Sequence, residues 1–281
     1  MTWRLRVTHS TGYTYDTEVV ASYNEARLTP IRVPQQFILD TSIDIYPPAR
    51  QNRYTDYWGS QVTSFDIHVP HSALEVTATS VVDTRDAAPA PATGMTWERL
   101  ADEKVTDPNV EFLAPTPLTT LARELTEPAV EAVIGMALPD AVVALGGIVH
   151  EHVTYTPGST GVKTSAAQAW ELGEGVCQDI AHSTLSLLRA AGIPGRYVSG
   201  YFASKGDAEV GGVVLGESHA WVEAWTGGWW GWDPTNGIGI GERHVVLARG
   251  RDYGDVPPLK GVMAGGASQA LGVTVEVTRL A

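Results

Sequence analysis

The sequence contains a single cysteine among its 281 residues. One cysteine excludes an internal disulfide and every paired-cysteine metal or redox motif. Cys177 is therefore either a small buried side chain or a reactive thiol, and this choice governs the interpretation of the rest of the chain.

Basic residues are also scarce, with 19 Lys and Arg against 32 Asp and Glu and a formal net charge of -13. Nucleic-acid binding relies on Lys and Arg to displace counterions from phosphates, so we expect no nucleic-acid partner. No apolar run is long enough to span a bilayer, and the N-terminus alternates polar and apolar residues instead of forming a secretion signal. We therefore expect a cytoplasmic protein without a membrane partner, and the sequence does not define its oligomeric state.

The first part of the chain predicts antiparallel β structure. Several segments alternate polar and apolar residues over the length of a strand, and proline and glycine separate them. We expect these segments to form a small β-sandwich over residues 1–88. The predicted strands are 3–8, 12–17, 38–46, 60–69 and 74–84.

The stretch 87–94 is rich in alanine and proline and has no periodic pattern, which indicates a linker that we place at 89–110. Residues 111–281 then predict helices followed by hairpin-connected strands, the order typical of an α+β domain. The predicted helices are 140–152, a short helix opened by a capping box at Ser165 and stopped by Gly173, and one from Cys177 to Gly192. The predicted strands are 196–202, 219–225, 229–233, 244–248 and 272–280.

Cys177 follows a Gly-Glu-Gly-Val segment at the predicted start of a helix. Unpaired backbone N–H groups and the positive end of the helix dipole stabilise a thiolate at that position. Gly173 and Gly175 would also leave room for a substrate backbone. The local sequence thus favours a nucleophile over a buried structural cysteine.

A thiolate nucleophile needs a base, and two histidines lie within reach along the chain. His182 is five residues beyond Cys177 but lies about 140° around the helix, so we expect it in the core or on the surface. His219 opens the predicted strand 219–225 and is the better candidate.

The loop 226–228 leads from that strand into 229–233 and sets the register of a hairpin. With three loop residues Trp225 faces Trp229, and Asp233 shares a face with His219 at a bridgeable diagonal of roughly 7 Å. A two-residue loop would turn Asp233 to the opposite face. Asp233 and the residues after it also fit ordinary turn chemistry, so the triad hypothesis depends on the register.

Other polar and aromatic residues extend this hypothesis. Backbone N–H groups at Cys177 could stabilise an oxyanion, with Gln178 or Tyr155 as a second donor. Five of the nine tryptophans lie between positions 221 and 232, and they form either a core or the wall of a cleft. Trp221 and Trp229 are the cleft candidates.

Metal catalysis is the weaker alternative. The pairs His68/His71 and His150/His152 lack a clear third ligand, and the second pair would diverge by about 200° on a helix. We therefore predict no metal and no other cofactor.

Several segments resemble bacterial transglutaminase-like proteins and keep the order Cys, His, Asp. These are 173–179, 193–201, 218–223 and 232–235 in the core, with 13–15, 27–30 and 251–258 on either side. The resemblance implies a papain-like α+β core in which Cys177 is the nucleophile, His219 the base and acid, and Asp233 its orienting partner. No motif matches the calcium sites of animal transglutaminases.

The resemblance also implies acyl transfer through a thioester on a glutamine-type amide or a peptide bond. Water would resolve the thioester in a protease or amidase, and a primary amine would resolve it in a transglutaminase. A protein or peptide substrate is expected in either case, and the sequence leaves the acceptor open. The alternative is a noncatalytic peptide-binding module that retains the papain-like fold.

Overall fold

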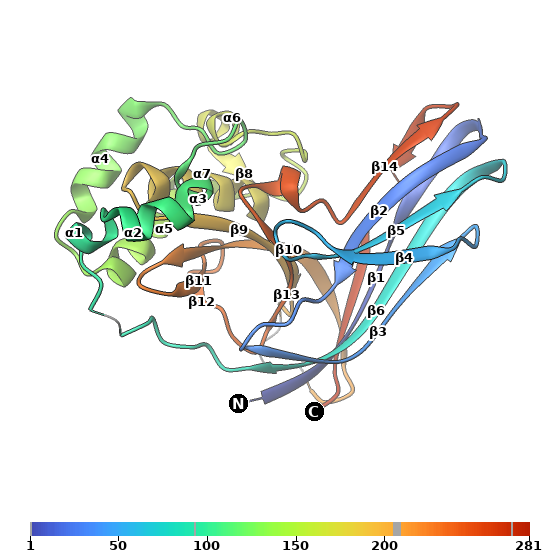
Figure 1. Cartoon of the computed structure of the whole chain (residues 1–281), viewed down its shortest axis with the longest axis horizontal. Coiled ribbons are helices and arrows are strands. Elements are labelled where there is room, and N and C mark those ends of the chain that lie inside the picture. Colours follow the sequence, from blue (N-terminus) through green and yellow to red (C-terminus); the bar gives the residue numbers. More distant parts are fainter. Residues whose placement is uncertain (1, 93, 205–208, 271) are drawn as a thin grey trace.

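The computed structural model describes residues 2–92, 94–204, 209–270 and 272–281. Two parts lie side by side in Figure 1, a β-sandwich built largely from the N-terminal strands and a group of helices packed on antiparallel strands that continue one sheet of the sandwich. The expected α+β class, with an antiparallel sandwich before a helix-and-sheet core, is confirmed. No helix among the described residues is both long and apolar enough to cross a membrane.

The sandwich consists of two antiparallel sheets that bury apolar side chains between them. One sheet contains β1, β6 and β3, and the other contains β2, β5 and β4. The strands are β1 (Thr2–Val19), β2 (Ala21–Thr29), β3 (Gln36–Tyr46), β4 (Gln51–Thr55), β5 (Gln61–Ile67) and β6 (His71–Arg85). The buried residues between the sheets are Ala26, Leu28, Ile43, Phe65, Ile67, Leu74, Val76 and Ala78.

Two of the predicted strands, 3–8 and 12–17, form the single strand β1, and no strand was predicted at β2 or β4. Gly12 does not break β1, because it pairs with Glu75 and lets the neighbouring backbone approach closely. A Cβ atom at Gly12 would lie only 2.0 Å from the carbonyl oxygen of Leu74. Here glycine allows strand contact instead of ending the strand.

The C-terminal strands return to the sandwich. β14 (Leu259–Ala264) pairs with β2, while β15 (Ser268–Ala270) and β16 (Thr274–Arg279) pair with β1. The predicted division into 1–88, 89–110 and 111–281 placed these strands with the core. In the structure they pair with strands of the sandwich instead. Alternation within a strand does not reveal a partner that lies over 200 positions away in the chain.

The helices gather on one side of the core sheet (Figure 1). α7 is central, because it contacts α4, α5 and α6 as well as β9 and β10. Two short α-helices and a 3₁₀ helix lie within the predicted linker. The helices are α1 (Trp97–Leu100), α2 (Glu103–Thr106), η1 (Asp107–Asn109), α3 (Val110–Leu113), α4 (Arg123–Val133), α5 (Leu138–His152), α6 (Ala166–Leu172), α7 (Cys177–Ala190) and η2 (Tyr253–Asp255).

The core sheet joins the sandwich through β10. The first part of β10 pairs with β16, and its later part pairs with β9 and β11. β13 continues the sheet on the far side of β9. The remaining strands are β7 (Thr154–Tyr155), β8 (Glu174–Gly175), β9 (Gly195–Phe202), β10 (Val213–Trp225), β11 (Trp229–Asp233), β12 (Ile238–Gly239) and β13 (His244–Gly250).

A buried ion network ties three adjacent strands of this sheet together. Glu223 of β10 accepts hydrogen bonds from Arg196 of β9 and, in a two-point contact at 2.8 and 2.9 Å, from Arg249 of β13. The two guanidinium groups hold the pKa of Glu223 below its usual range, although burial raises it. Three strands are thus fixed in register beside the site.

Candidate active site

The helix start predicted at Cys177 is confirmed, because α7 begins at this residue. Asp179 caps the helix, and its Oδ2 accepts the Val176 N–H at 2.8 Å and the Thr160 hydroxyl at 2.5 Å. One fully buried carboxylate therefore joins the turn before Cys177 to the loop after β7. Burial raises the pKa of Asp179, and these hydrogen bonds oppose the rise.

The two glycines before Cys177 serve the chain itself. Gly173 ends α6 with a left-handed φ of 70°, which confirms the predicted stop. Gly175 lies against Asp179, and a Cβ atom there would stand 2.8 Å from the Asp179 Cβ. Gly175 needs to lack a side chain so that Asp179 can pack against it. The sequence suggested a different reason for this glycine, namely room for a substrate backbone.

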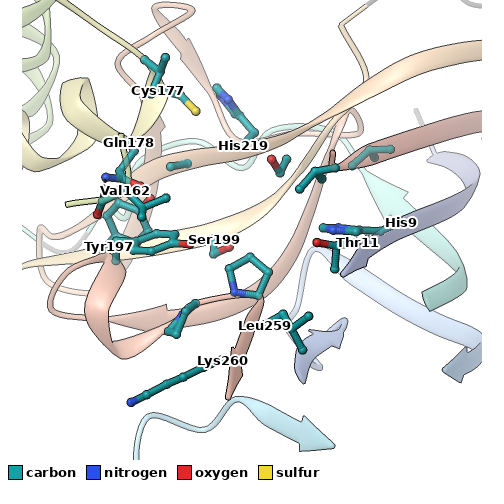
Figure 2. Close-up of a pocket in the computed structure, with 18 of the residues that line it drawn as sticks. His9, Thr11, Val162, Cys177, Gln178, Tyr197, Ser199, His219, Leu259 and Lys260 are labelled. Carbon is teal, nitrogen blue, oxygen red and sulfur yellow. Dashed lines mark hydrogen bonds between the residues drawn. The ribbon is translucent and has the colours of Figure 1, made fainter. Parts of the chain in front are cut away.

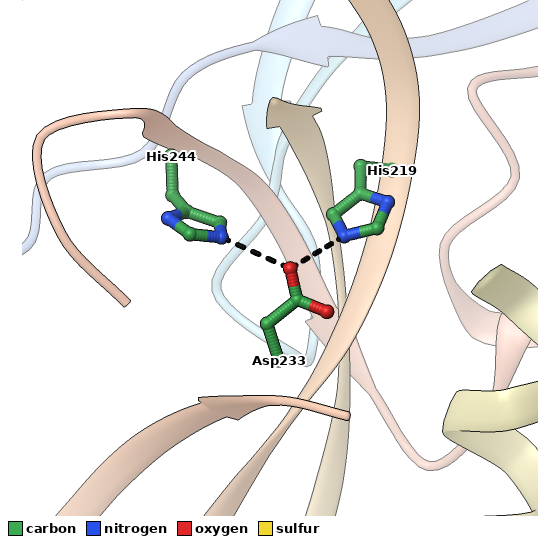
Figure 3. Close-up of side chains that lie close together, drawn as sticks. All are labelled: His219, Asp233 and His244. Atoms are coloured by element: carbon green, nitrogen blue, oxygen red, sulfur yellow. Dashed lines mark hydrogen bonds and ion pairs between the residues drawn. The ribbon is translucent and has the colours of Figure 1, made fainter. Parts of the chain in front are cut away.

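The hairpin has the register on which the triad hypothesis depends. Trp225 pairs with Trp229, and the N–H of Thr226 donates to the carbonyl of Gly228 at 3.1 Å across the three-residue loop. Asp233 thereby falls on the face of β11 that meets His219. The distance from His219 Nε2 to Asp233 Oδ2 is 2.8 Å (Figure 3).

Cys177 lies on the other side of the His219 ring. Figure 2 shows the sulfur of Cys177 turned toward this imidazole. His219 and Asp233 are buried, whereas Cys177 is half-buried and faces a pocket. The structure thus brings the three predicted residues together in the order thiol, imidazole, carboxylate.

Charge coupling among these groups outweighs the effect of burial. Burial disfavours the imidazolium of His219, but hydrogen bonds to Asp233 and Cys177 raise the pKa of His219 to about 10. Burial likewise disfavours the Asp233 carboxylate, yet hydrogen bonds from His219 and His244 hold its pKa well below the usual range. The arrangement favours a protonated His219 beside an ionised Asp233.

Asp233 accepts more hydrogen bonds than a triad requires. Its Oδ1 accepts the backbone N–H groups of Thr235 and Asn236 at 3.0 and 3.2 Å, which is the turn chemistry that the sequence suggested. Its Oδ2 also accepts from the Asn236 side chain at 2.7 Å and lies 3.2 Å from His244 Nε2. The turn contacts that the sequence suggested and the contact with His219 therefore occur together at Asp233.

Sequence reasoning missed His244 and Asn236 as neighbours of the triad. Asn236 carried a signal, since an Asn three residues after an Asp is typical of a turn closed by side chains. His244 carried none, because it lies at the start of an ordinary strand and reaches Asp233 only through the folded sheet (Figure 3).

Among the described residues, one cluster of side chains has the ligand spacing of a metal site, and it consists of His219, Asp233 and His244. Both histidines, however, direct Nε2 at the same carboxylate oxygen, at 2.8 and 3.2 Å. An Nε2 that donates a proton to Asp233 has no lone pair for a metal. These contacts suit hydrogen bonding, and the absence of a metal cofactor stays a prediction.

The pocket beside Cys177 has a volume of about 950 Å³ and lies between the core and the sandwich (Figure 2). β1, β14 and β16 supply one wall, and α7, β9 and β10 supply the other. The lining residues are His9, Thr11, Gly12, Tyr13, Tyr155, Pro157, Val162, Val176, Cys177, Gln178, Tyr197, Ser199, Gly216, Ser218, His219, Ala220, Tyr253, Gly254, Pro257, Pro258, Leu259, Lys260, Gly261, Val273 and Val275.

Both candidate oxyanion donors line this pocket. The Gln178 amide donates to the Val162 carbonyl at 3.3 Å and so holds the loop that forms one edge of the pocket. Tyr155 lies on β7, whose partner β8 ends two residues before Cys177, and 41% of Tyr155 is exposed. Tyr155 is therefore the more accessible of the two.

The cleft role expected for Trp221 and Trp229 is corrected, because neither side chain lines the pocket. Trp221 is fully buried and packs with Val198 and Val246. Trp229 lies under the guanidinium of Arg196 at 4.1 Å. Trp221 thus belongs to the core, as the tryptophan-core alternative anticipated, whereas Trp229 is half-buried and packs edge-on against Phe112 and Trp225.

His182 belongs to the core, as expected from its direction on the helix. It is fully buried, and its Nε2 accepts the N–H of Tyr253 at 3.1 Å. Burial lowers the pKa of His182 to about 3, so the ring stays neutral. It links α7 to the segment after β13.

A helix that begins at a cysteine, packed on an antiparallel sheet that holds an adjoining His–Asp pair, is the arrangement of papain-like thiol enzymes. Residues 5–83 match the bacterial transglutaminase-like N-terminal region, and residues 119–234 match the transglutaminase-like superfamily. The chain belongs to the transglutaminase-like superfamily.

The chain is also similar to individual proteins in sequence and in fold. An uncharacterized protein of Mycobacterium leprae is 46% identical over 279 residues, covering 99% of this chain and all of that protein. A Pseudomonas aeruginosa protein-glutamine gamma-glutamyltransferase is 38% identical over 109 residues, which are 35% of this chain and 16% of that protein. The fold resembles that of a candidate cysteine protease from Cytophaga hutchinsonii, with a TM-score of 0.77, 22% identity, and coverage of 100% of this chain and 92% of that one.

Proposed function

We propose that the protein is a thiol-dependent acyl-transfer enzyme that cleaves glutamine-type amides or peptide bonds. Cys177 is the nucleophile, His219 the base and acid, and Asp233 the residue that orients His219. The observation that carries the proposal is the His219–Asp233 contact at 2.8 Å, with the Cys177 sulfur on the opposite side of the ring.

In the first step His219 takes the proton of the Cys177 thiol, and the thiolate attacks the substrate carbonyl carbon. The resulting oxyanion collapses, the C–N bond breaks, and His219 returns the proton to the departing ammonia or amine. Cys177 is left as a thioester. His219 then deprotonates the acceptor, which displaces the thiol and regenerates the starting state.

Backbone N–H groups at the start of α7 support the oxyanion, since the first turn of a helix leaves such donors unpaired. We assign Tyr155 as the second donor, because it lines the pocket beside Cys177 and is 41% exposed. Tyr155→Phe should lower kcat by about a hundredfold or more, and Gln178→Ala should lower it less. Equal losses in both variants would leave Tyr155 without a special role.

The pocket supports hydrolysis as the main reaction. None of the described residues that line it is Asp or Glu, and Lys260 adds a positive charge. A lysine side chain or other protonated amine therefore finds no counter-charge there, whereas water needs none. Amine transfer stays the second candidate, because part of the chain is similar to a protein-glutamine gamma-glutamyltransferase.

The test is incubation of the protein with a labelled glutamine peptide, with and without a labelled primary amine. Released acid or cleaved peptide would support hydrolysis, and amine incorporated into product would support transglutamination. Cys177→Ala should abolish either product, while His68→Gln, a change at an exposed histidine, should not. A protein with no product, and a thiol that titrates near pH 8.5, would instead fit the noncatalytic peptide-binding module.

A protein or peptide substrate and a cytoplasmic location are further parts of this proposal. Fractionation of cells that express the protein tests the location. Recovery with envelope or secreted proteins would contradict it.

A further inference from the structure

A second histidine contacts the carboxylate of the proposed triad. His244 opens β13, is 3% exposed, and places Nε2 at 3.2 Å from Asp233 Oδ2. Figure 3 shows His219 and His244 converging on this oxygen from two sides. Two imidazoles therefore share one carboxylate oxygen.

The hydrogen bond on the far side of the ring sets the tautomer of His244. The N–H of Gly241 donates to His244 Nδ1 at 3.3 Å, so Nδ1 must carry a lone pair. The ring proton then resides on Nε2 and is donated to Asp233. Burial lowers the pKa of His244 despite the nearby Asp233 carboxylate, and this lowered pKa keeps the ring neutral.

Packing fixes the orientation of both rings. Phe202 contacts His219 and His244, with ring centroids at 5.1 and 4.8 Å, and Trp221 meets His244 edge-on at 5.3 Å. The charged groups near His244 are Asp233, His219 when protonated, and Arg243, whose guanidinium lies over Phe202.

We propose that His244 is a positioning residue for the acyl transfer. The neutral ring of His244 donates its Nε2–H to Asp233, and this hydrogen bond weakens the hold of Asp233 on the proton of His219. This inference rests on the proposed function. A neutral donor stabilises the carboxylate without placing a second cation beside His219. His219 can then give up its proton to the leaving group and act again as a base.

Removal of this donor should strengthen the hold of Asp233 on the His219 proton. We expect His244→Phe to raise the pKa of His219 by about one unit and to lower turnover about tenfold, because fewer neutral imidazoles remain for deacylation. His244→Gln, whose amide N–H can stand near the Nε2 position, should stay within about threefold of the wild type.

The test compares the rates at which iodoacetate and iodoacetamide alkylate the protein across pH. Cys177 is the only cysteine in the sequence, so the reaction reports one thiol. Iodoacetate is an anion, so a neighbouring imidazolium speeds its reaction with the thiol, whereas iodoacetamide is neutral. The ratio of the iodoacetate rate to the iodoacetamide rate therefore falls as His219 loses its proton. The midpoint of that fall measures the His219 pKa without a substrate.

A midpoint that rises in His244→Phe and returns in His244→Gln supports the inference. Identical midpoints in all three proteins overturn it, even if His244→Phe melts at a lower temperature, since a merely structural role would not move the midpoint. If His244→Phe does not fold, His244→Asn takes its place, because its shorter amide cannot reach Asp233. Failure of the proposed function is distinct, because wild-type Cys177 would then react as an ordinary thiol with both reagents.

A chelator provides the last check. Hydrogen bonds among His219, Asp233 and His244 predict that EDTA leaves the wild-type profile unchanged. A profile that shifts on chelation and returns with added Zn²⁺ would show that the three side chains bind a metal, and would overturn the inference.

Discussion

Trp225 lies directly opposite Trp229 across the β10–β11 hairpin, and this pairing places Asp233 on the same face as His219. A slip of one residue would turn Asp233 away from the imidazole. The chemistry proposed for Cys177 thus depends on the length of a loop whose residues do not line the pocket beside Cys177.

Asp233→Asn should nearly abolish turnover while the fold remains. The amide cannot stabilise an imidazolium, and loss of the carboxylate in a related triad lowers kcat about 10⁴-fold. We expect at least a hundredfold loss here, together with slower alkylation of Cys177 at about pH 6. Asp66→Asn, at an exposed aspartate on β5, is the matched control and should behave as the wild type. Normal turnover in Asp233→Asn would contradict the orienting role.

Gly175→Ala should destabilise the protein and slow Cys177. The added methyl group would lie 2.8 Å from the Asp179 Cβ and push the cap of α7 out of place. Overpacking of this kind costs about 1–3 kcal/mol. Gly147→Ala is the control, because Gly147 lies within α5 and the new methyl group would meet nothing within 4 Å beyond its chain neighbours and the nearby backbone of its own helix. It should stabilise the helix by up to about 1 kcal/mol. Urea unfolding of both variants provides the comparison.

The stability of the protein should fall as pH rises from about 6.5 to about 10 through the titration of His219. The folded-state pKa of His219 lies above its unfolded value, so the folded state holds an extra proton in this window. The slope from this group can reach about 1.4 kcal/mol per pH unit. Cys177→Ala removes the thiol titration together with one of the two hydrogen bonds that raise the pKa of His219, so the fall in stability should span a narrower pH range in this variant. Adding Asp233→Asn should flatten the slope, and an unchanged slope would count against the coupling.

His182→Leu separates a structural histidine from the proposed base. The change leaves the N–H of Tyr253 without its acceptor, which costs about 1–3 kcal/mol. The pH dependence of Cys177 alkylation should stay as in the wild type, whereas His219→Gln should abolish the reactivity at low pH. A shifted alkylation profile in His182→Leu would mean that His182 acts on the thiol.

Local chemistry explains why much of the site could be predicted from the sequence. The cap at Ser165, the stop at Gly173 and the helix start at Cys177 each depend on residues within one turn. The hairpin register depends only on the loop 226–228. The cleft role of Trp221 was predicted wrongly, because alternation shows which residues share a face and not what covers that face.

The sequence by itself determined the α+β class, the helix that carries Cys177 and the hairpin that carries His219 and Asp233. Only the tertiary structure decided that β14 and β16 extend the two sheets of the sandwich, that the pocket lies between the core and the sandwich, and that His244 meets Asp233. The physical reason is the distance along the chain over which each kind of interaction acts. Caps, turns and alternation act between near neighbours, whereas strand pairing and buried contacts join residues through space, and packing of the whole chain selects them.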